Sequence, residues 1–254
     1  MMNNKRFTEM NDVIKTIRSH RSIRKFQQRP IDEDILIGLI ETGQAAASSS
    51  FVQACSVIRV TDKNHRKQIA EAAGGQQWVI DAPEFLVFCA DLNRIDLACQ
   101  KQDLGRLEGY TEHFIVATVD VALLAQNVLL AAESMGLGGV FIGGIRNDPQ
   151  LLCDLLALPD QVYPAFGMCL GWPDVDPDIK PRFPVQSILH QGVYQNDNIE
   201  QDIKNYDELM KDYYKSRSGS TRLSNWSTQT ANAMQLKKRE HMLTFLNKRG
   251  LLKR

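Results

Sequence analysis

Residues 131–147 read AAESMGLGGVFIGGIRN, and this stretch decides the fold class. It completes the most apolar segment of the chain, which begins at Ile115, and Gly136 suits the left-handed position that ends a helix. Val140 to Ile142 then predict a short strand between the glycine pairs 138/139 and 143/144. A long helix followed directly by a strand predicts interleaved helices and strands, with the backbone close to other atoms at the glycines.

The flanking sequence continues this alternation. Apolar residues at helical spacing predict helices around 14–17 and over 32–40, 64–73, 115–135 and 149–158. Apolar and β-branched runs predict strands over 57–60, 85–89, 140–142 and 165–170. We expect residues 174–184, DVDPDIKPRFP, to form an extended proline-rich loop, and residues 216–232, rich in Ser, Thr and Asn, to form a surface loop.

The charge balance limits the function classes. The 254 residues include 30 basic and 30 acidic side chains, which argues against a uniformly basic nucleic-acid-binding protein and an acidic disordered chain. This neutrality is an average, because the segment from Lys211 to the end has 11 basic residues against 2 acidic ones. We interpret that segment as an appendage to the main domain. A nucleic-acid-binding tail is the distant alternative function, and apolar residues at helical spacing, such as Met242 and Phe245, argue against it.

The cysteines and the apolar segments indicate a cytoplasmic protein without a membrane span. The five cysteines contain no CxxC pair, so we expect free thiols in a reducing compartment. The N-terminal sequence is interrupted by Asp12, Lys15 and Arg18 and does not resemble a signal peptide. The longest charge-free part of the apolar segment, 121–132, is too short to cross a bilayer, so we expect a buried helix.

The glycine run does not match the common nucleotide-binding loops. A dinucleotide-binding GxGxxG starting at Gly136 requires glycine where Phe141 stands, and a phosphate-binding loop requires Lys and Ser or Thr where Ile145 and Arg146 stand. Glycines that serve tight turns only are the alternative interpretation. The sequence has neither HExxH nor GxSxG, so we predict no metal site and no catalytic nucleophile.

Two short basic clusters suit an anion. His20, Arg21, Ser22 and Arg24 place four hydrogen-bond donors within five residues, and Lys180 and Arg182 flank a proline. Cationic donors of this kind bind phosphate groups. A solvated charged surface is the alternative for each cluster taken separately.

Five motifs in order resemble the oxygen-insensitive NADPH nitroreductase and flavin reductase family. They are HRSIRKF (20–26), SSSF (48–51), GGQ (74–76), the 131–147 stretch and FGMCLGWPDVDPDIKPR (166–182). The resemblance extends from about residue 11 to the C-terminal LNKRGLLKR. It implies an α+β, nitroreductase-like fold, with a central, mostly antiparallel sheet flanked by helices and a C-terminal excursion, assembled as a homodimer with one FMN per subunit at the interface. Residues 1–190 would form the FMN-binding core. Residues 191–254 would be an extension of the same domain that contributes to NADPH binding and dimer contacts.

The resemblance also assigns site residues. The FMN phosphate and ribityl chain would be held by His20, Arg21, Ser22, Arg24, Lys180 and Arg182. The flavin ring would be lined by Ser48, Ser49, Gln76 and the backbone at Ile142, Gly143 and Gly144. The NADPH 2′-phosphate would be held by Arg217 and Arg222, and the rest of that nucleotide by Arg146 and Arg239. Two departures from the family pattern are Ala47, where close members have a further serine, and KKRE at 237–240, where they have ESRP. Residues 103–113 match poorly, and we assign no site there.

The function implied by the resemblance is reduction of nitroaromatics, quinones or free flavins by NADPH through bound FMN, in a ping-pong, two-electron mechanism. The partners would be a small aromatic acceptor and a second copy of the chain, without nucleic acid or membrane. The flavin carries the chemistry, so no catalytic acid or base is assigned. A dedicated NADPH-FMN reductase that supplies reduced flavin, for example to a luciferase, is the alternative.

Overall fold

The computed structural model describes residues 11–216, 224–236 and 238–254. The chain divides into two compact units. The first comprises Met1–Asp176 together with Glu240–Arg254, and the second comprises Pro177–Arg239. The final segment of the chain therefore belongs to the first unit, and the interpretation of everything after Lys211 as an appendage is wrong for that segment. Phe245, Leu246 and Leu251 are buried in the core of this unit, which explains why it returns there.

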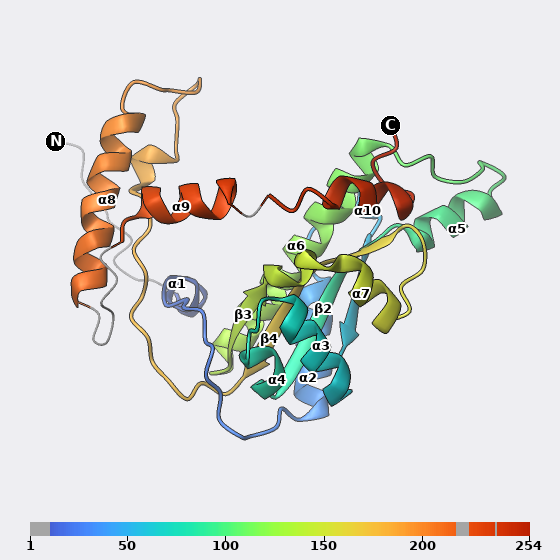
Figure 1. Ribbon diagram of the computed structural model, residues 1–254, viewed down its shortest axis with the longest axis horizontal. Coiled ribbons are helices and arrows are strands. Elements are labelled where there is room, and N and C mark those ends of the chain that lie inside the picture. The colour runs from blue at the N-terminus through green and yellow to red at the C-terminus, as the bar shows by residue number, and fades with distance from the viewer. Residues whose placement is uncertain (1–10, 217–223, 237) are drawn as a thin grey trace. The chain divides into compact units, whose positions relative to one another are not determined.

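A four-stranded antiparallel sheet lies at the centre of the first unit (Figure 1). Its strands are β1 (Cys55–Arg59), β2 (Glu84–Asp91), β3 (Gly138–Ile142) and β4 (Val162–Gly171), in the order β1-β2-β4-β3. The register pairs Val57 with Phe88, Phe88 with Phe166, and Phe141 with Met168. Every residue of β2 is buried, as its continuous apolar run predicts. The sheet confirms the predicted α+β class.

Helices surround this sheet, and several begin at residues that the sequence marks. The first unit contains α1 (Asp12–Arg18), α2 (Glu33–Gln44), α3 (Lys63–Ala72), α4 (Trp78–Asp81), α5 (Asn93–Lys101), α6 (Thr111–Ser134), α7 (Pro149–Leu155) and α10 (Met242–Lys248), with 3-10 turns η1 (Ser49–Phe51) and η2 (Gly143–Asn147). The side chains of Asn11, Asp62 and Asp148 accept hydrogen bonds from the first-turn amides of α1, α3 and α7. Figure 1 shows α3 and α4 in front of the strands.

Helix α6 contributes one face to the core. Its buried residues include Asp120, Val121, Leu124 and Val128, and it contacts all four strands. By length and composition alone, α6 could cross a membrane, a test that core helices also pass. Its opposite face leaves Ile115, Val119 and Leu123 between 43% and 49% exposed. The prediction of a buried helix is confirmed for one face.

The second unit contains η3 (Val185–Ser187), α8 (Ile199–Ser216) and α9 (Trp226–Gln235). Phe183 stacks on Tyr206 at 3.9 Å between ring centroids and meets Trp226 edge-on at 5.0 Å. The prediction of a loop over 216–232 is wrong from Trp226 onward, where α9 begins. The Asn225 side chain caps this helix by accepting from Thr228 N, and the half-buried Trp226 ring packs against Phe183, so local polar composition does not decide the structure here.

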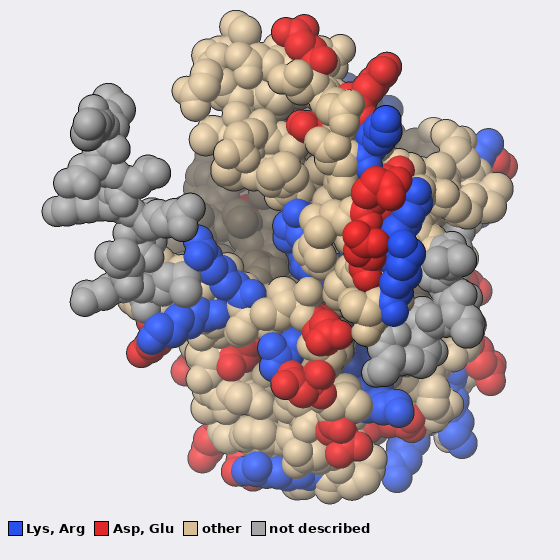
Figure 2. Space-filling view, turned by 90° about the vertical axis from the view of Figure 1, so that its left-hand side faces the viewer, with Lys and Arg blue, Asp and Glu red and all other residues tan. Residues whose placement is uncertain are grey.

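Charged side chains of both signs mix on the surface. On α8, Lys211 pairs with Glu208 at 2.6 Å and Lys215 with Asp212 at 3.2 Å. Figure 2 shows basic side chains lying among acidic ones on the face drawn. Exposed pairs of this kind add little stability.

Candidate functional site

The first basic cluster lies along the edge of the sheet. Ile23 N donates to Gly139 O at 3.0 Å, Gln27 N donates to Trp172 O at 2.9 Å, and the side chains of Ile23 and Phe26 are buried. A Cβ on Gly138 would lie 2.5 Å from Ile23 Cγ1, so glycine is required for this close approach. These apolar anchors fix the segment, and the polar residues between them face outward.

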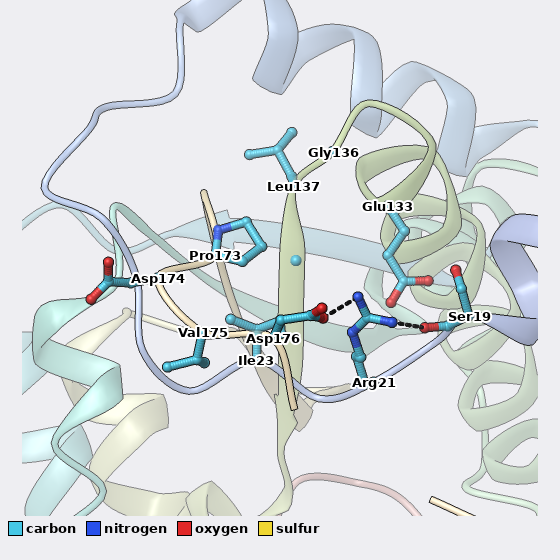
Figure 3. A pocket seen from close by; sticks show the side chains of 11 residues that line it. Ser19, Arg21, Ile23, Glu133, Gly136, Leu137, Pro173, Asp174, Val175 and Asp176 are labelled. Carbon is cyan, nitrogen blue, oxygen red and sulfur yellow. Dashed lines mark hydrogen bonds and ion pairs between the residues drawn. The ribbon is translucent and has the colours of Figure 1, made fainter. Parts of the chain in front are cut away.

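Two members of this cluster pair with acids. His20 Nδ1 lies 2.6 Å from Oε1 of Glu133, which stands in the last turn of α6. Arg21 forms an ion pair with Asp176 and donates to Ser19 O at 3.4 Å. Figure 3 shows Arg21 between these two residues in a cavity of about 480 Å³, which Glu133 also lines. Glu133 and Asp176 therefore hold the His20 ring and the Arg21 guanidinium in place.

Arg24 points to a different neighbour. Its guanidinium carbon lies 5.7 Å from the ring centroid of Trp78, at the start of α4. Trp78 follows the GGQ motif, so Arg24 lies beside the segment that contains Gln76. Gln76 Nε2 donates to Ala73 O at 2.7 Å, at the end of α3.

The glycine pair after β3 contacts this same segment. A Cβ on Gly144 would lie 2.6 Å from Gln76 Nε2 and 2.5 Å from Ala73 O. A Cβ on Gly143 would lie 3.2 Å from Arg146 Nη2. The structure thus brings the predicted residues Gln76, Gly143, Gly144 and Arg146 together at the C-terminal end of β3, where Ile142 is the last residue. The glycine at 144 is needed because η2 packs against the end of α3 there.

Arg146 is held by neighbouring backbone. Its Nη1 donates to Ala165 O in β4, and its carbonyl oxygen lies 3.0 Å from Nε2 of His241. The second contact attaches the returning C-terminal segment to η2. His241 follows Arg239, another predicted NADPH residue, by two positions.

The predicted serines lie at the other edge of the sheet, before β1. Ser48 Oγ donates to Asp120 Oδ2 at 2.7 Å, Ser49 N donates to Oδ1 at 3.1 Å, and Ala54 N donates to Oδ2 at 3.1 Å. Sequence reasoning missed Asp120 as a site residue. A signal was available, because an acid within an apolar helix is retained only where donors satisfy it.

The segment that these bonds hold has an uncommon backbone. Ser50, Phe51 and Gln53 have φ values of 47°, 59° and 51°, in the left-handed region that non-glycine residues rarely adopt. Such conformations cost about 1–3 kcal/mol each and persist where surrounding structure imposes them. Ser48 and Asp120 also line a hollow of about 750 Å³ with Cys55, where burial raises the pKa of the Cys55 thiol.

The second basic cluster lies in the other compact unit. Arg182 Nη1 donates to Lys180 O at 2.7 Å, and Lys180 Nζ lies 5.7 Å from the ring centroid of Tyr214. Tyr206 OH donates to Pro181 O at 2.7 Å and ties the KPR tripeptide to α8. Burial raises the pKa of Tyr206, and the neighbouring Arg182 opposes this shift. Arg217 and Arg222 lie outside the residues that the structure describes.

The predicted residues of the first unit therefore form two groups. The first lies by β3 and comprises His20, Arg21, Ser22, Arg24, Gln76, Ile142, Gly143, Gly144 and Arg146, and the second, Ser48 and Ser49, precedes β1. β1 and β3 are opposite edges of the four-stranded sheet. Three strand spacings separate them by roughly 14 Å. Within the described ranges, no three His, Cys, Asp or Glu side chains converge as metal ligands would.

Known proteins share this architecture. The profile of the Nitroreductase family matches residues 17–172, and that of its C-terminal domain matches residues 180–254. The NADPH-flavin oxidoreductase of Vibrio harveyi is 45% identical over 96% of this chain and 100% of its own length. The oxygen-insensitive NADPH nitroreductase of Salmonella typhimurium is 41% identical over 95% of this chain and 98% of its own.

A solved structure agrees with both. The NADPH:FMN oxidoreductase of Vibrio harveyi in complex with NAD+ superposes with a TM-score of 0.87 and 42% identity, covering 96% of this chain and 100% of that one. Sequence and fold agree over nearly the whole length, so this chain belongs to the nitroreductase family.

Proposed function

We propose that this chain is an FMN-dependent oxidoreductase that uses NADPH to reduce nitroaromatics, quinones or free flavins. The observation that carries the proposal is the group beside β3, where the docked HRSIRKF segment, Gln76 and the glycines of η2 meet. The names of the relatives, an NADPH-flavin oxidoreductase and an NADPH nitroreductase, support the same chemistry.

The residues present fit FMN. Arg21 and Arg24 supply cationic donors suited to a phosphate and His20 adds a polar ring, and the extended segment at the sheet edge turns them outward from the buried Ile23. Gly143 and Gly144 have no side chain between the backbone and a ligand, so amide groups can approach a flat ring closely. Gln76, Ser48 and Ser49 add neutral polar groups, which suit the polar edge of a flavin. Lys180 and Arg182 would complete the phosphate site.

When bound, FMN supplies the two-electron transfer between NADPH and an acceptor. The protein's residues position the cofactor and the substrates. Hydrogen-bond donors at Gln76 and at the backbone of 142–144 would stabilise negative charge on the ring. We assign no catalytic acid or base. A ping-pong sequence, in which the nicotinamide leaves before a flat acceptor enters, needs only one open ring face and accounts for several acceptor types.

We also propose that the active form is a homodimer. Ser48 and Ser49 lie at the opposite sheet edge from Gly143 and Gly144, so one ring that contacts both groups requires two protomers. The exposed side chains of Ile115, Val119 and Leu123 form an apolar stripe on α6 that a second copy would bury. A cytoplasmic location fits the five free cysteines.

For NADPH, we propose that Arg217 and Arg222 hold the 2′-phosphate and that Arg146 and Arg239 contact the rest of the nucleotide. In this arrangement residues 1–190 hold FMN and residues 191–254 add NADPH and dimer contacts. The charge of the 2′-phosphate distinguishes NADPH from NADH, so cationic side chains are the required recognition elements.

The test begins with flavin content and continues with steady-state rates. The purified protein should carry about one FMN per chain, and NADPH oxidation should accelerate when a nitrofuran or a quinone is added. Comparable kcat/KM values for these acceptors and free FMN support the broad reductase. A value for free FMN that exceeds the others by several orders of magnitude favours the dedicated flavin reductase. A colourless protein that oxidises no NADPH contradicts both.

A further inference from the structure

Asp120 is a buried acid that the proposed chemistry does not use. It lies on the core face of α6, only 3% exposed, and its carboxylate turns toward the segment 48–54. A buried carboxylate is stable only where donors surround it, and here the donors come from one short loop. Asp120 and the loop 48–54 are therefore held together by these hydrogen bonds.

The hydrogen bonds link both ends of the loop to the helix. Ser48 Oγ and Ser49 N bind the carboxylate at the start, and Ala54 N binds it at the end. Ser48 Oγ also accepts from Gln53 N at 2.7 Å. Its single hydrogen is donated to Asp120, so the Ser48 hydroxyl has none left for a ligand.

The middle of the loop depends on these ends. Ser50, Phe51 and Gln53 adopt left-handed backbone conformations, and Phe51 projects outward with 81% of its surface exposed. The turn bonds Phe51 N to Ser48 O and Val52 N to Ser49 O, at 3.2 and 3.0 Å, close the loop without fixing it to the core. Asp120 binds both ends of the loop, and at the second end Ala54 O also accepts from Asp91 N of β2 at 2.9 Å.

We propose that Asp120 is a positioning residue for the flavin site. It acts through Ser48 and the amides of Ser49 and Ala54, and it holds the serine loop in the conformation that contacts the ring of FMN. This inference rests on the proposed function, and it changes the role of one predicted residue. Ser48 serves the loop, while Ser49 and Ser50, whose side chains are exposed, face the ligand.

The test compares Asp120→Asn with a matched buried acid. Asp96 is 1% exposed and accepts from Arg106, from Gln100 and from Leu107 N. It stands on α5, which borders the same hollow, but its bonds go to the turn at 100–107. Both substitutions keep side-chain size and remove one buried charge, so both should lower the unfolding temperature.

Two measurements separate positioning from stability. FMN dissociation constants of the apoproteins come from flavin fluorescence titration, and amide hydrogen exchange is followed in peptides that cover 48–54 and 96–107. Asp120→Asn should weaken FMN binding at least tenfold and speed exchange in 48–54. Asp96→Asn should speed exchange in 96–107 and leave FMN affinity within about twofold of the parent.

Further variants cover a failure to fold. Ser48→Ala removes the hydrogen bond to Asp120 and should weaken FMN binding severalfold. The control is Ser134→Ala, which changes an exposed serine on α6, the helix of Asp120, and should leave FMN binding unchanged. In a double-mutant cycle, Ser48→Ala should add little to Asp120→Asn, because both break the same link. Equal FMN losses for Asp96→Asn and Asp120→Asn, or an unchanged affinity in both Asp120→Asn and Ser48→Ala, would overturn the inference. A parent protein that binds no FMN contradicts the proposed function instead, and the exchange data still test the role of Asp120 in the loop.

Discussion

Gly144→Ala tests how the β3 group is assembled. The added methyl carbon would lie 2.5 Å from Ala73 O, 2.6 Å from Gln76 Nε2 and 3.0 Å from Ala73 Cα. Gln76 can rotate, but Ala73 is buried backbone at the end of α3 and cannot. Packed carbon atoms lie at about 3.5–4.0 Å, so the end of α3 must move by roughly 1 Å.

The magnitude follows from this overlap. Overpacking of a closed site costs about 1–3 kcal/mol. For a chain of this size, a loss of about 2 kcal/mol lowers Tm by roughly 4–8 °C. Gln76 loses its place beside η2, and the loss of one hydrogen bond to FMN, worth about 0.5–1.5 kcal/mol, weakens binding by about two- to tenfold.

The assay uses apoprotein, so that stability and affinity are measured separately. Differential scanning calorimetry gives Tm, and fluorescence titration gives the FMN dissociation constant. Gly38→Ala is the matched control, because a Cβ there meets nothing within 4 Å in the protomer and the residue lies inside α2. Alanine is the better helix former, so the control should keep or slightly raise Tm and leave FMN affinity unchanged. A Gly144→Ala protein with the Tm and the FMN affinity of the parent would show that the contact between η2 and the end of α3 tolerates a methyl group and does not position Gln76. Weaker FMN binding in Gly144→Ala but not in Gln76→Ala would show that the effect does not pass through Gln76.

Four further predictions concern the thiols, the dimer and the nucleotide. Burial raises the pKa of Cys153 to about 11 and raises those of Cys89 and Cys169 further, so these three thiols should resist Ellman's reagent at pH 8 in the native protein, and more than two reactive thiols per native chain would contradict this. The raised pKa of Cys153 should make the free energy of unfolding fall as the pH rises from the ordinary thiol value of 9.0 toward 11, because this thiol ionises there only in the unfolded chain. A free energy of unfolding that urea titrations find unchanged over this pH range would contradict this. Leu123→Asp, on the exposed face of α6, should give a monomer in sedimentation that retains less FMN, whereas Leu104→Asp, at another exposed leucine, should remain dimeric; a dimeric Leu123→Asp protein argues against this interface. Arg217→Ala and Arg222→Ala should each raise the KM for NADPH about tenfold, or about 1.4 kcal/mol, and leave NADH kinetics unchanged, while equal losses with both nucleotides would remove these arginines from 2′-phosphate recognition.

Much of the fold could be predicted from the sequence, because its signals are local. Alternating and continuous apolar runs located β1 to β4, and Gly136, with φ of 82°, ended α6 where expected. The helix α8 was missed although Ile203, Tyr206 and Met210 lie at helical spacing, since its many charges obscured the stripe. The start of α9 was mispredicted because Trp226 is held by aromatic contacts from distant residues.

The candidate site was only partly predictable. Basic residues and glycines stand out in a sequence, and the structure places several of them together beside β3. Asp120 and Glu133, the acids that contact Ser48 and His20, are single charged residues within an apolar helix. Their roles depend on contacts to Ser48 and His20, which lie 72 and 113 residues away in sequence. No local pattern encodes such pairs, so only the folded structure reveals them.

In the proposed function, this chain passes electrons from NADPH to an aromatic acceptor through bound FMN. Anaerobic spectrophotometry of the purified protein tests it most directly. We expect one equivalent of NADPH per chain to bleach the absorbance of oxidised flavin, and a nitrofuran added afterwards to restore it without further NADPH. A protein whose bound flavin is not reduced by NADPH, or that purifies and reconstitutes without flavin, would contradict the proposed function.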